Sequence, residues 1–239
     1  MNASAASTND KPWIVITGTS SGIGAAMLAQ IPDRYRVLSI ARREPVSPTA
    51  HHVTLDIADL RASGWDAVRE LLAGQSIQGV AHMAGELGER GPLIEQDPTT
   101  WDSVFHVTLT GMLQLTQICW PGLIAGGNGR VVLATSGAAR NRVPNVAVYG
   151  VAKAAMERFA EVLAIESGDE GPRVVVVNPG PTATPMRAKV MPDEDPATLP
   201  DAAAVAQVYV EQLIGSLPAQ GSRVEARQWL NEQFGLSFK

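Results

Sequence analysis

The chain has 239 residues, of which 45% are hydrophobic and 18% are charged, with a formal net charge of −5. This composition is typical of a globular protein, and the acidic balance argues against nucleic-acid or anionic-membrane partners. The single cysteine, Cys119, excludes an intrachain disulfide, and the four histidines at 51, 52, 82 and 106 lack the spacing of metal ligands, so we expect no metal site.

The chain begins with a polar segment, residues 1–12, which lacks the basic and apolar regions of a secretory signal. We expect this segment to be a flexible tail that precedes a single domain at 13–239. No apolar run approaches the length of a membrane span. These features predict a cytoplasmic protein.

Short β-branched runs then alternate with longer helical patterns. The predicted strands lie at 13–17, 36–41, 51–56, 79–84, 130–135, 173–178 and 222–226. The predicted helices lie near 22–31, 59–73, 99–120, 150–168 and 202–214. Such alternation indicates βαβ units, and consecutive apolar positions are typical of parallel strands buried on both faces. We therefore predict an α/β fold with a doubly wound sheet between two helical layers.

The turn after the first predicted strand is rich in glycine. It reads TGTSSGIG at 17–24 and opens the first predicted helix. Glycines allow a tight turn and a close approach to a pyrophosphate, and a helix N-terminus supplies free N–H groups. The turn therefore predicts a dinucleotide site, with a glycine turn that binds nothing as the alternative. Its candidate residues are Gly18, Ser20, Ser21, Gly22, Ile23 and Gly24.

The end of the second predicted strand indicates which dinucleotide is bound. A carboxylate there favours NAD, whereas arginine accommodates the 2′-phosphate of NADP. The sequence SIARREP places Arg42 and Arg43 there, so we expect NADP(H) to be preferred and NAD(H) to be possible. Two solvated arginines are the alternative. Asp56 and Ile57 are candidates to contact the adenine, although Asp56 could equally cap the following helix.

The third predicted helix is followed by a strand, and then by a helix that opens with a possible catalytic pair. In VYGVAKAAM, Tyr149 and Lys153 stand four residues apart, so their side chains leave the same helix face. A nearby cation favours the phenolate and could lower the pKa of the phenol. The alternative is a packed ring beside a surface ion.

The segment 179–200 interrupts the alternation after the sixth predicted strand. It contains six prolines and no sustained periodicity, which favours a loop with a short helix at most. Ligands bind beyond the carboxyl ends of such strands. We therefore expect a substrate lid, with a mobile surface loop as the alternative.

Together these motifs resemble the short-chain dehydrogenase/reductase family, classical type. The resemblance extends from Trp13 to the C-terminus. It rests on TGTSSGIG, Asp56, the Ala-Gly at 84–85, Ser136, YGVAK at 149–153 and NPGPTATPM at 178–186. It implies a single Rossmann-type domain with a seven-stranded parallel sheet. It also implies an NAD(P)-dependent oxidoreductase that acts on a small-molecule carbonyl or alcohol.

The resemblance also implies a role for each matching residue. Tyr149 would be the general acid in reduction and the base in oxidation, Lys153 would lower its pKa and bind the nicotinamide ribose, and Ser136 would bond the substrate oxygen. The remaining cofactor contacts would come from Ala84, Gly85, Pro179, Gly180, Thr182 and Thr184.

Two positions depart from the family pattern. Met83 and Thr108 stand where the family usually has asparagine, and the second asparagine is thought to support a proton relay to the lysine. Threonine has a hydroxyl but no amide, so slower or altered proton delivery is expected. This departure supports an alternative function, a nucleotide-binding regulator that has lost turnover.

A shorter stretch, TSGAARNRVPNVAVY at 135–149, is similar to the sepiapterin- and benzil-reductase branch, whose members reduce dicarbonyl-type substrates with NADPH. We expect pocket residues from 85–93, 137–145 and the lid. In the family, the long helix from about residue 99 and the helix carrying Tyr149 often form a subunit interface. The resemblance therefore implies a homodimer or homotetramer.

Overall fold

The computed structural model describes residues 11–45, 51–141 and 143–235. Of the tail expected at 1–12, residues 1–10 lie outside the described residues. The seven predicted strands are all present and form one parallel sheet in the order β3-β2-β1-β4-β5-β6-β7. They are β1 (Trp13–Thr17), β2 (Arg36–Ala41), β3 (His51–Thr54), β4 (Ile77–His82), β5 (Arg130–Ala134), β6 (Arg173–Asn178) and β7 (Ser222–Glu225).

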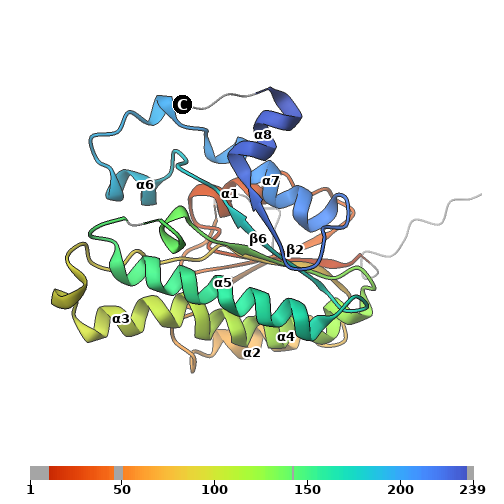
Figure 1. The fold of residues 1–239 in the computed structure, drawn as a ribbon. Helices are drawn as coiled ribbons and strands as arrows, with labels where there is room; N and C mark the ends of the chain where they lie inside the picture. The colour runs from red at the N-terminus through yellow and green to blue at the C-terminus, as the bar shows by residue number, and fades with distance from the viewer. Residues whose placement is uncertain (1–10, 46–50, 142, 236–239) are drawn as a thin grey trace, which may run out of the picture.

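Helices cover both faces of this sheet, as Figure 1 shows. They are α1 (Gly22–Leu28), α2 (Gly64–Leu72), α3 (Pro98–Phe105), α4 (Gly111–Ala125), α5 (Ala147–Ser167), α6 (Pro185–Val190), α7 (Ala202–Ile214) and α8 (Ala226–Phe234). Buried side chains of α2, α4 and α5 form one core with the sheet, and those of α1, α7 and α8 form the other. The predicted doubly wound, Rossmann-type α/β fold is therefore confirmed.

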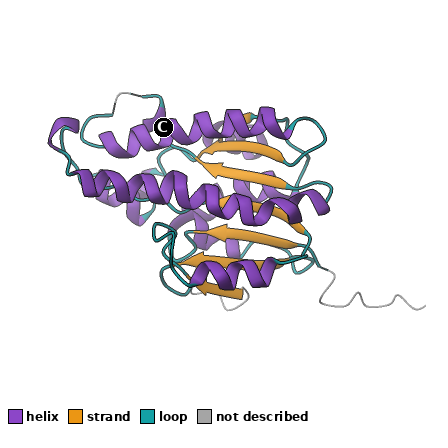
Figure 2. Ribbon diagram, turned by 90° about the horizontal axis from the view of Figure 1, so that it is seen from below, coloured by secondary structure: helices purple, strands orange, loops and turns teal. Residues whose placement is uncertain are grey.

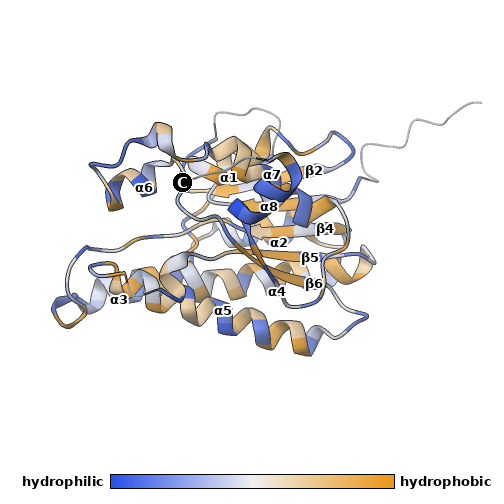
Figure 3. Ribbon diagram, turned by 45° about the horizontal axis from the view of Figure 1, so that its top comes forward, coloured by the Kyte–Doolittle hydropathy of each residue, from blue (hydrophilic) through white to orange (hydrophobic). Residues whose placement is uncertain are grey.

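The central strand β1 shows why both faces must be covered. Trp13 and Val15 point to the face of α2, α4 and α5, whereas Ile14 and Ile16 point to the face of α1 and α7, and all four are fully buried. Full burial of one such aliphatic side chain contributes about 1.5–3 kcal/mol. In Figure 3 the strands are accordingly coloured mainly as hydrophobic. A strand that is apolar on both faces can only be stable between two layers.

Strand β4 begins and ends two residues earlier than the predicted 79–84. Gly79 lies inside the strand, where a Cβ atom would come 2.7 Å from Leu213 Cδ2 of α7. Glycine is therefore used here for close packing of helix on strand rather than for a turn. The strand ends at His82 because the next two amide groups, of Met83 and Ala84, donate to Thr17 Oγ1 at 3.0 Å instead of to a strand.

Two helical regions also differ from expectation. The single helix predicted at 99–120 consists of α3, a π-helical turn (His106–Thr110) and α4, which continues through Pro121. Helix α8 was not predicted, because it follows β7 without a turn and buries only Ala226 and Leu230, too few positions for a clear periodicity. Within the described residues, no helix combines the length and the apolarity that crossing a membrane requires.

The strand order places the carboxyl ends of several strands at one edge of the sheet. The arrows in Figure 2 all point in the same direction, because every pairing in the sheet is parallel. Between β1 and β4 the chain leaves the sheet in opposite directions. In doubly wound folds this switch point creates the crevice in which ligands bind.

Candidate active site

A cavity of about 810 Å³ opens at this edge of the sheet. It brings together most of the predicted site residues, from the first loop to the segment after β6. Those that line it are Gly18, Ser20, Ser21, Gly22, Ile23, Gly24, Arg42, Arg43, Asp56, Ile57, Ala84, Gly85, Tyr149, Lys153, Pro179 and Thr184. Ser136, Thr108, Gly180 and Thr182 are not among its lining residues.

The glycine turn lies directly against the end of β4. Gly18 has a φ of +70°, and a Cβ atom on it would come 2.7 Å from the backbone nitrogen of Ala84. A Cβ atom on Gly24 would lie 2.5 Å from the carbonyl oxygen of Gly18. Only glycine fits these two positions. At these two positions the backbone of the turn packs closely, with no side chain between it and its neighbours.

At the end of β2, Arg42 and Arg43 line the part of the cavity next to Asp56. The guanidinium of Arg42 is 3.9 Å from one carboxylate oxygen of Asp56, and the other oxygen accepts a hydrogen bond from Ala58 N at 3.0 Å. Helix α2 begins only at Gly64, so Asp56 does not cap a helix. The Arg42 side chain is 69% exposed, which leaves its charge available to an anionic ligand.

At the opposite end, helix α5 brings Tyr149 and Lys153 to the cavity from one face, as the i, i+4 spacing predicts. Lys153 Nζ lies 5.7 Å from the centre of the Tyr149 ring and donates a hydrogen bond to the Ala134 carbonyl at 2.7 Å. Lys153 is only 3% exposed, and burial lowers its pKa to about 8. The ammonium group is therefore held beside the phenol at the end of β5.

Ser136 lies beside this pair although it does not line the cavity. Its side chain lowers the pKa of the neighbouring Tyr149, and its Oγ accepts a hydrogen bond from Ala138 N at 3.2 Å. Burial raises the pKa of Tyr149, and the Ser136 side chain opposes that rise. The phenol is therefore protonated at neutral pH and has a polar neighbour aligned with it.

Two further side chains near this pair were missed. Tyr209 of α7 lines the cavity and donates a hydrogen bond to the Val177 carbonyl at 3.2 Å. Burial, and to a smaller extent the nearby Tyr149, raise the pKa of Tyr209 well above its ordinary value. His82 is buried, and its pKa is lowered to about 3 by burial and by the charge of Lys153. In the sequence, Tyr209 is marked only by its hydroxyl within a mainly apolar predicted helix, which does not indicate a functional site.

The two departures from the family pattern have different surroundings. Met83 is half-buried and lines the cavity. Thr108 lies in the π-helical turn, is 2% exposed, and its Oγ1 has no hydrogen-bond partner among the described residues.

The outer part of the cavity is lined by loops and by two helices. The loop 85–89 contributes, as predicted for 85–93, and α3 adds Thr99, Thr100 and Ser103. From the segment 179–200, helix α6 adds Met186 and Lys189. The segment 137–145, also expected to supply pocket residues, supplies none of the described lining residues.

Hydrogen bonds join the two ends of the segment 179–200 and also link residues inside it. Ala183 N donates to the Pro200 carbonyl at 2.9 Å, and Arg187 makes two hydrogen bonds to Glu194 at 2.6 and 2.8 Å. Thr182 is buried at this base, where its hydroxyl donates to the Gly180 carbonyl at 3.2 Å.

Among the described residues, no group of three or more His, Cys, Asp or Glu side chains is arranged to hold a metal ion.

Comparison with known proteins gives consistent matches. A model of the short chain dehydrogenase family matches residues 12–195. The oxidoreductase YciK of Escherichia coli (strain K12) is 31% identical over 212 residues, which are 82% of this chain and 84% of that protein. L-xylulose reductase of Bos taurus is 28% identical over 200 residues, 76% of this chain and 80% of that protein.

A solved structure resembles the whole fold. It is a short chain dehydrogenase from Escherichia coli CFT073 complexed with NADPH, with a TM-score of 0.81 and 29% sequence identity. The match covers 92% of this chain and 99% of that chain.

Proposed function

Because the chain belongs to the short-chain dehydrogenase/reductase family of NAD(P)-dependent oxidoreductases, we propose that it transfers hydride between NADP(H) and a small-molecule carbonyl or alcohol. The observation that carries this proposal is that Tyr149 and Lys153, with Ser136 beside them, share a cavity with Arg42 and Arg43. The bovine relative is named as a reductase of L-xylulose, a sugar with a ketone group, which supports a carbonyl substrate. The similarity of residues 135–149 to dicarbonyl reductases makes vicinal diketones the first substrates to test.

The residues present fit NADP(H). The glycine turn lines the cavity, and glycine at 18 and 24 allows the tight turn that a bound pyrophosphate requires. Arg42 and Arg43 can form charge-assisted hydrogen bonds to the 2′-phosphate. The similar solved structure contains NADPH. When bound, the nicotinamide supplies or accepts the hydride.

The chain's own residues handle the proton. Burial keeps Tyr149 protonated at neutral pH, so its hydroxyl can give a proton to the carbonyl oxygen of the substrate. Ser136, whose side chain lowers the pKa of Tyr149, can bond the same oxygen and stabilise its developing charge. Lys153 is charged below about pH 8 and favours the phenolate that remains after transfer. We propose that proton delivery toward Lys153 is slower with Thr108 than with the asparagine that the family usually has at this position.

Segment 179–200 is proposed to act as the substrate lid. Its base is fixed by the Ala183–Pro200 hydrogen bond, and α6 carries Met186 and Lys189 over the cavity. The Arg187–Glu194 pair holds the lid together from within, since two parallel bonds between a guanidinium and a carboxylate fix their relative orientation. Gly180 and Thr182, at the lid base, are proposed to contact the cofactor once it is bound.

We also propose that copies of the chain associate through α4 and α5. Helix α4, GMLQLTQICWPGLIA, has no charged residue, which is unusual for a helix at a protein surface. Ile124 of α4 is 58% exposed and Ile165 of α5 is 78% exposed, and the two helices run side by side in Figures 1 and 2. Association would remove these side chains from water and give the homo-oligomer that the family resemblance implies.

The decisive experiment measures consumption of NADPH and of NADH by the purified protein with ketones, diketones, quinones and aldehydes, beside the Tyr149→Phe variant. We expect activity with NADPH that exceeds activity with NADH. The variant should lose at least about 100-fold in kcat, because general acid catalysis contributes 10²–10⁴-fold. Its Kd for NADPH should stay within about twofold of the wild type, since the phenol hydroxyl acts on the substrate.

Tyr35→Phe is the matched control, because Tyr35 is a half-buried tyrosine that does not line the cavity. It should leave both kcat and Kd unchanged. Tight binding of NADPH with no turnover of any carbonyl compound would reject the reductase proposal and favour a nucleotide-binding regulator.

A further inference from the structure

Glu157 is a buried carboxylate near the candidate active site. The mechanism proposed above gives this residue no role. It lies on α5, four residues after Lys153 and eight after Tyr149, so the three side chains share one side of the helix. It is 7% exposed. A carboxylate removed from water destabilises the fold unless hydrogen-bond donors surround it. The donors around Glu157 therefore indicate which segments it fixes in place.

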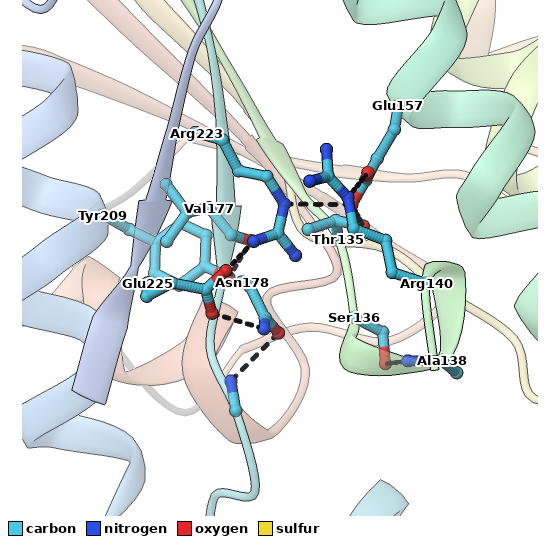
Figure 4. A network of polar contacts seen from close by, with 11 residues as sticks. Thr135, Ser136, Ala138, Arg140, Glu157, Val177, Asn178, Tyr209, Arg223 and Glu225 are labelled. Atoms are coloured by element: carbon cyan, nitrogen blue, oxygen red, sulfur yellow. Dashed lines mark hydrogen bonds and ion pairs between the residues drawn. The ribbon is translucent and has the colours of Figure 1, made fainter. Parts of the chain in front are cut away.

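Two of these partners flank Ser136 in the sequence. Thr135 Oγ1 donates a hydrogen bond to Glu157 Oε1 at 2.7 Å, and Arg140 Nε donates one to Oε2 at 2.6 Å. Thr135 immediately precedes Ser136, and Arg140 follows the 3-10 turn Gly137–Ala139. Figure 4 shows both side chains meeting Glu157. The Ser136 segment is therefore fastened at two points to the helix that carries the tyrosine and the lysine.

A third partner extends this network to β7 and β6. Arg223 Nε of β7 donates to Glu157 Oε1 at 3.3 Å, and its guanidinium also pairs with Glu225. Glu225 Oε2 accepts a hydrogen bond from Asn178 Nδ2 at 2.6 Å, and Asn178 Oδ1 accepts one from Gly180 N at 3.2 Å. In Figure 4 these contacts run without a break from α5 to the turn after β6.

The surroundings keep Glu157 ionised. Burial raises its pKa, but hydrogen bonds from Arg140 and Thr135, together with the charge of Arg223, outweigh burial and hold the pKa below its ordinary value. Hydrogen bonds from a guanidinium to a carboxylate are short and directional. An ionised Glu157 can therefore fix the position of both segments that contact it.

We propose that Glu157 is a positioning residue for the reductase reaction, which holds the Ser136 hydroxyl against the Tyr149 hydroxyl through Thr135 and Arg140. The proposal rests on the proposed function, because it assigns Glu157 to that same reaction. Without the carboxylate, the Ser136 segment loses its contacts through Thr135 and Arg140, and the Ser136 side chain is no longer held beside the Tyr149 phenol. The pKa of Tyr149 should then rise, although Glu157 touches neither Tyr149 nor the cavity.

The test compares Glu157→Gln with Glu161→Gln. Glu161 lies one turn later on α5 and also pairs with an arginine, Arg158 at 2.8 Å, but its side chain is 52% exposed and outside the network. Amide hydrogen exchange of the free protein should be about fivefold or more faster at 135–141 and 178–182 in Glu157→Gln, because even one lost hydrogen bond shifts a local equilibrium by about that factor. In Glu161→Gln, exchange in both segments should match the wild type.

The readout specific to positioning is the titration of Tyr149. Ultraviolet titration of phenolate, taken as the difference between each protein and its Tyr149→Phe counterpart, gives the Tyr149 pKa without any turnover. Glu157→Gln should raise this pKa. With a diketone such as benzil as substrate, kcat should fall about tenfold while the Kd for NADPH stays within about twofold.

Each result decides the proposal. Unchanged exchange at 135–141, or faster exchange with an unchanged Tyr149 pKa, would reject a positioning role for Glu157. If the wild type reduces no carbonyl compound, the proposed function fails, and the Tyr149 titration still decides whether Glu157 aligns Ser136. If Glu157→Gln does not fold, Arg140→Gln replaces it, because the Arg140 side chain is 57% exposed and its loss removes one of the same two fastenings.

Discussion

His82 of β4 lies close enough to Lys153 of α5 for the charge of the lysine to lower the pKa of the histidine. The Thr116 hydroxyl donates to the Met112 carbonyl at 2.8 Å, so it accepts a hydrogen bond from His82 Nε2 at 2.9 Å. This arrangement fixes the neutral histidine with its proton on Nε2. Because burial disfavours the charged imidazolium, and because protonation would add a second buried cation near Lys153, the pKa of His82 is lowered to about 3.

The suppressed protonation of His82 predicts a loss of stability in acid. Between pH 6.5 and about 3, the unfolded chain binds a proton that the folded chain excludes, so the free energy of unfolding falls as the pH decreases. One such group contributes about 1.4 kcal/mol per pH unit inside this window. His82→Gln keeps a donor for Thr116 but does not titrate, so urea denaturation between about pH 6 and pH 4 should show a shallower loss than in the wild type.

His106→Gln is the control for this prediction, because His106 is exposed and lies outside the His82–Thr116 contact. If the free energy of unfolding falls equally with decreasing pH in the wild type and in His82→Gln, His82 does not cause the loss of stability in acid.

At the scale of elements, the π-helical turn between α3 and α4 adapts one long helix to the cofactor cavity. Val107 of this turn lines the cavity, and Gly111, the first residue of α4, packs so closely that a Cβ atom would come 2.1 Å from the Ile57 carbonyl oxygen. A π-helical turn inserts an extra residue in a helix and is often found at functional sites. Here it places Thr108 in the buried interior, with its hydroxyl lacking a partner among the described residues.

The place of Thr108 in this turn predicts a gain of activity. Thr108→Asn introduces an amide that can donate and accept at the same time, so proton delivery should accelerate and kcat with NADPH should rise, by up to about tenfold. Steady-state kinetics with the best carbonyl substrate measures the effect. The control is Thr110→Asn, at an exposed position of the same turn. An unchanged or lower kcat in Thr108→Asn would count against an impaired relay.

At the scale of the whole molecule, the exposed apolar side chains of α4 and α5 predict self-association. Ile124→Glu and Ile165→Glu each place a charge on this face, where the side chains are exposed, so folding should be unaffected. Each should weaken association by about tenfold or more, since burial of one isoleucine is worth about 1.5–3 kcal/mol. Sedimentation over a range of protein concentrations measures this.

Ile94→Glu is the matched control, because Ile94 is 93% exposed but belongs to a 3-10 turn (Leu93–Glu95) rather than to α4 or α5. A wild type that remains monomeric at every concentration, or an equal effect of all three variants, would contradict an interface on this face.

The sequence by itself determined the alternation of elements, and with it the fold class, because each of the seven strands is a local run of apolar and β-branched residues. It also predicted most of the site. The glycine turn, Arg42, Arg43, Tyr149 and Lys153 each stand at the end of a strand or the start of a helix, and parallel strands bring such positions to one edge. Their spacing along the chain is therefore sufficient to group them.

Only the tertiary structure decided how that site is supported. Glu157, Arg223 and Asn178 lie on three different elements, and no spacing in the sequence joins them. The same holds for Tyr209, which reaches the cavity from α7, and for Gly79, whose place inside β4 depends on the approach of a helix more than a hundred residues later. A buried hydrogen bond or a close approach depends on distances set by the packing of whole layers, whereas a strand or a glycine turn depends on its own few residues.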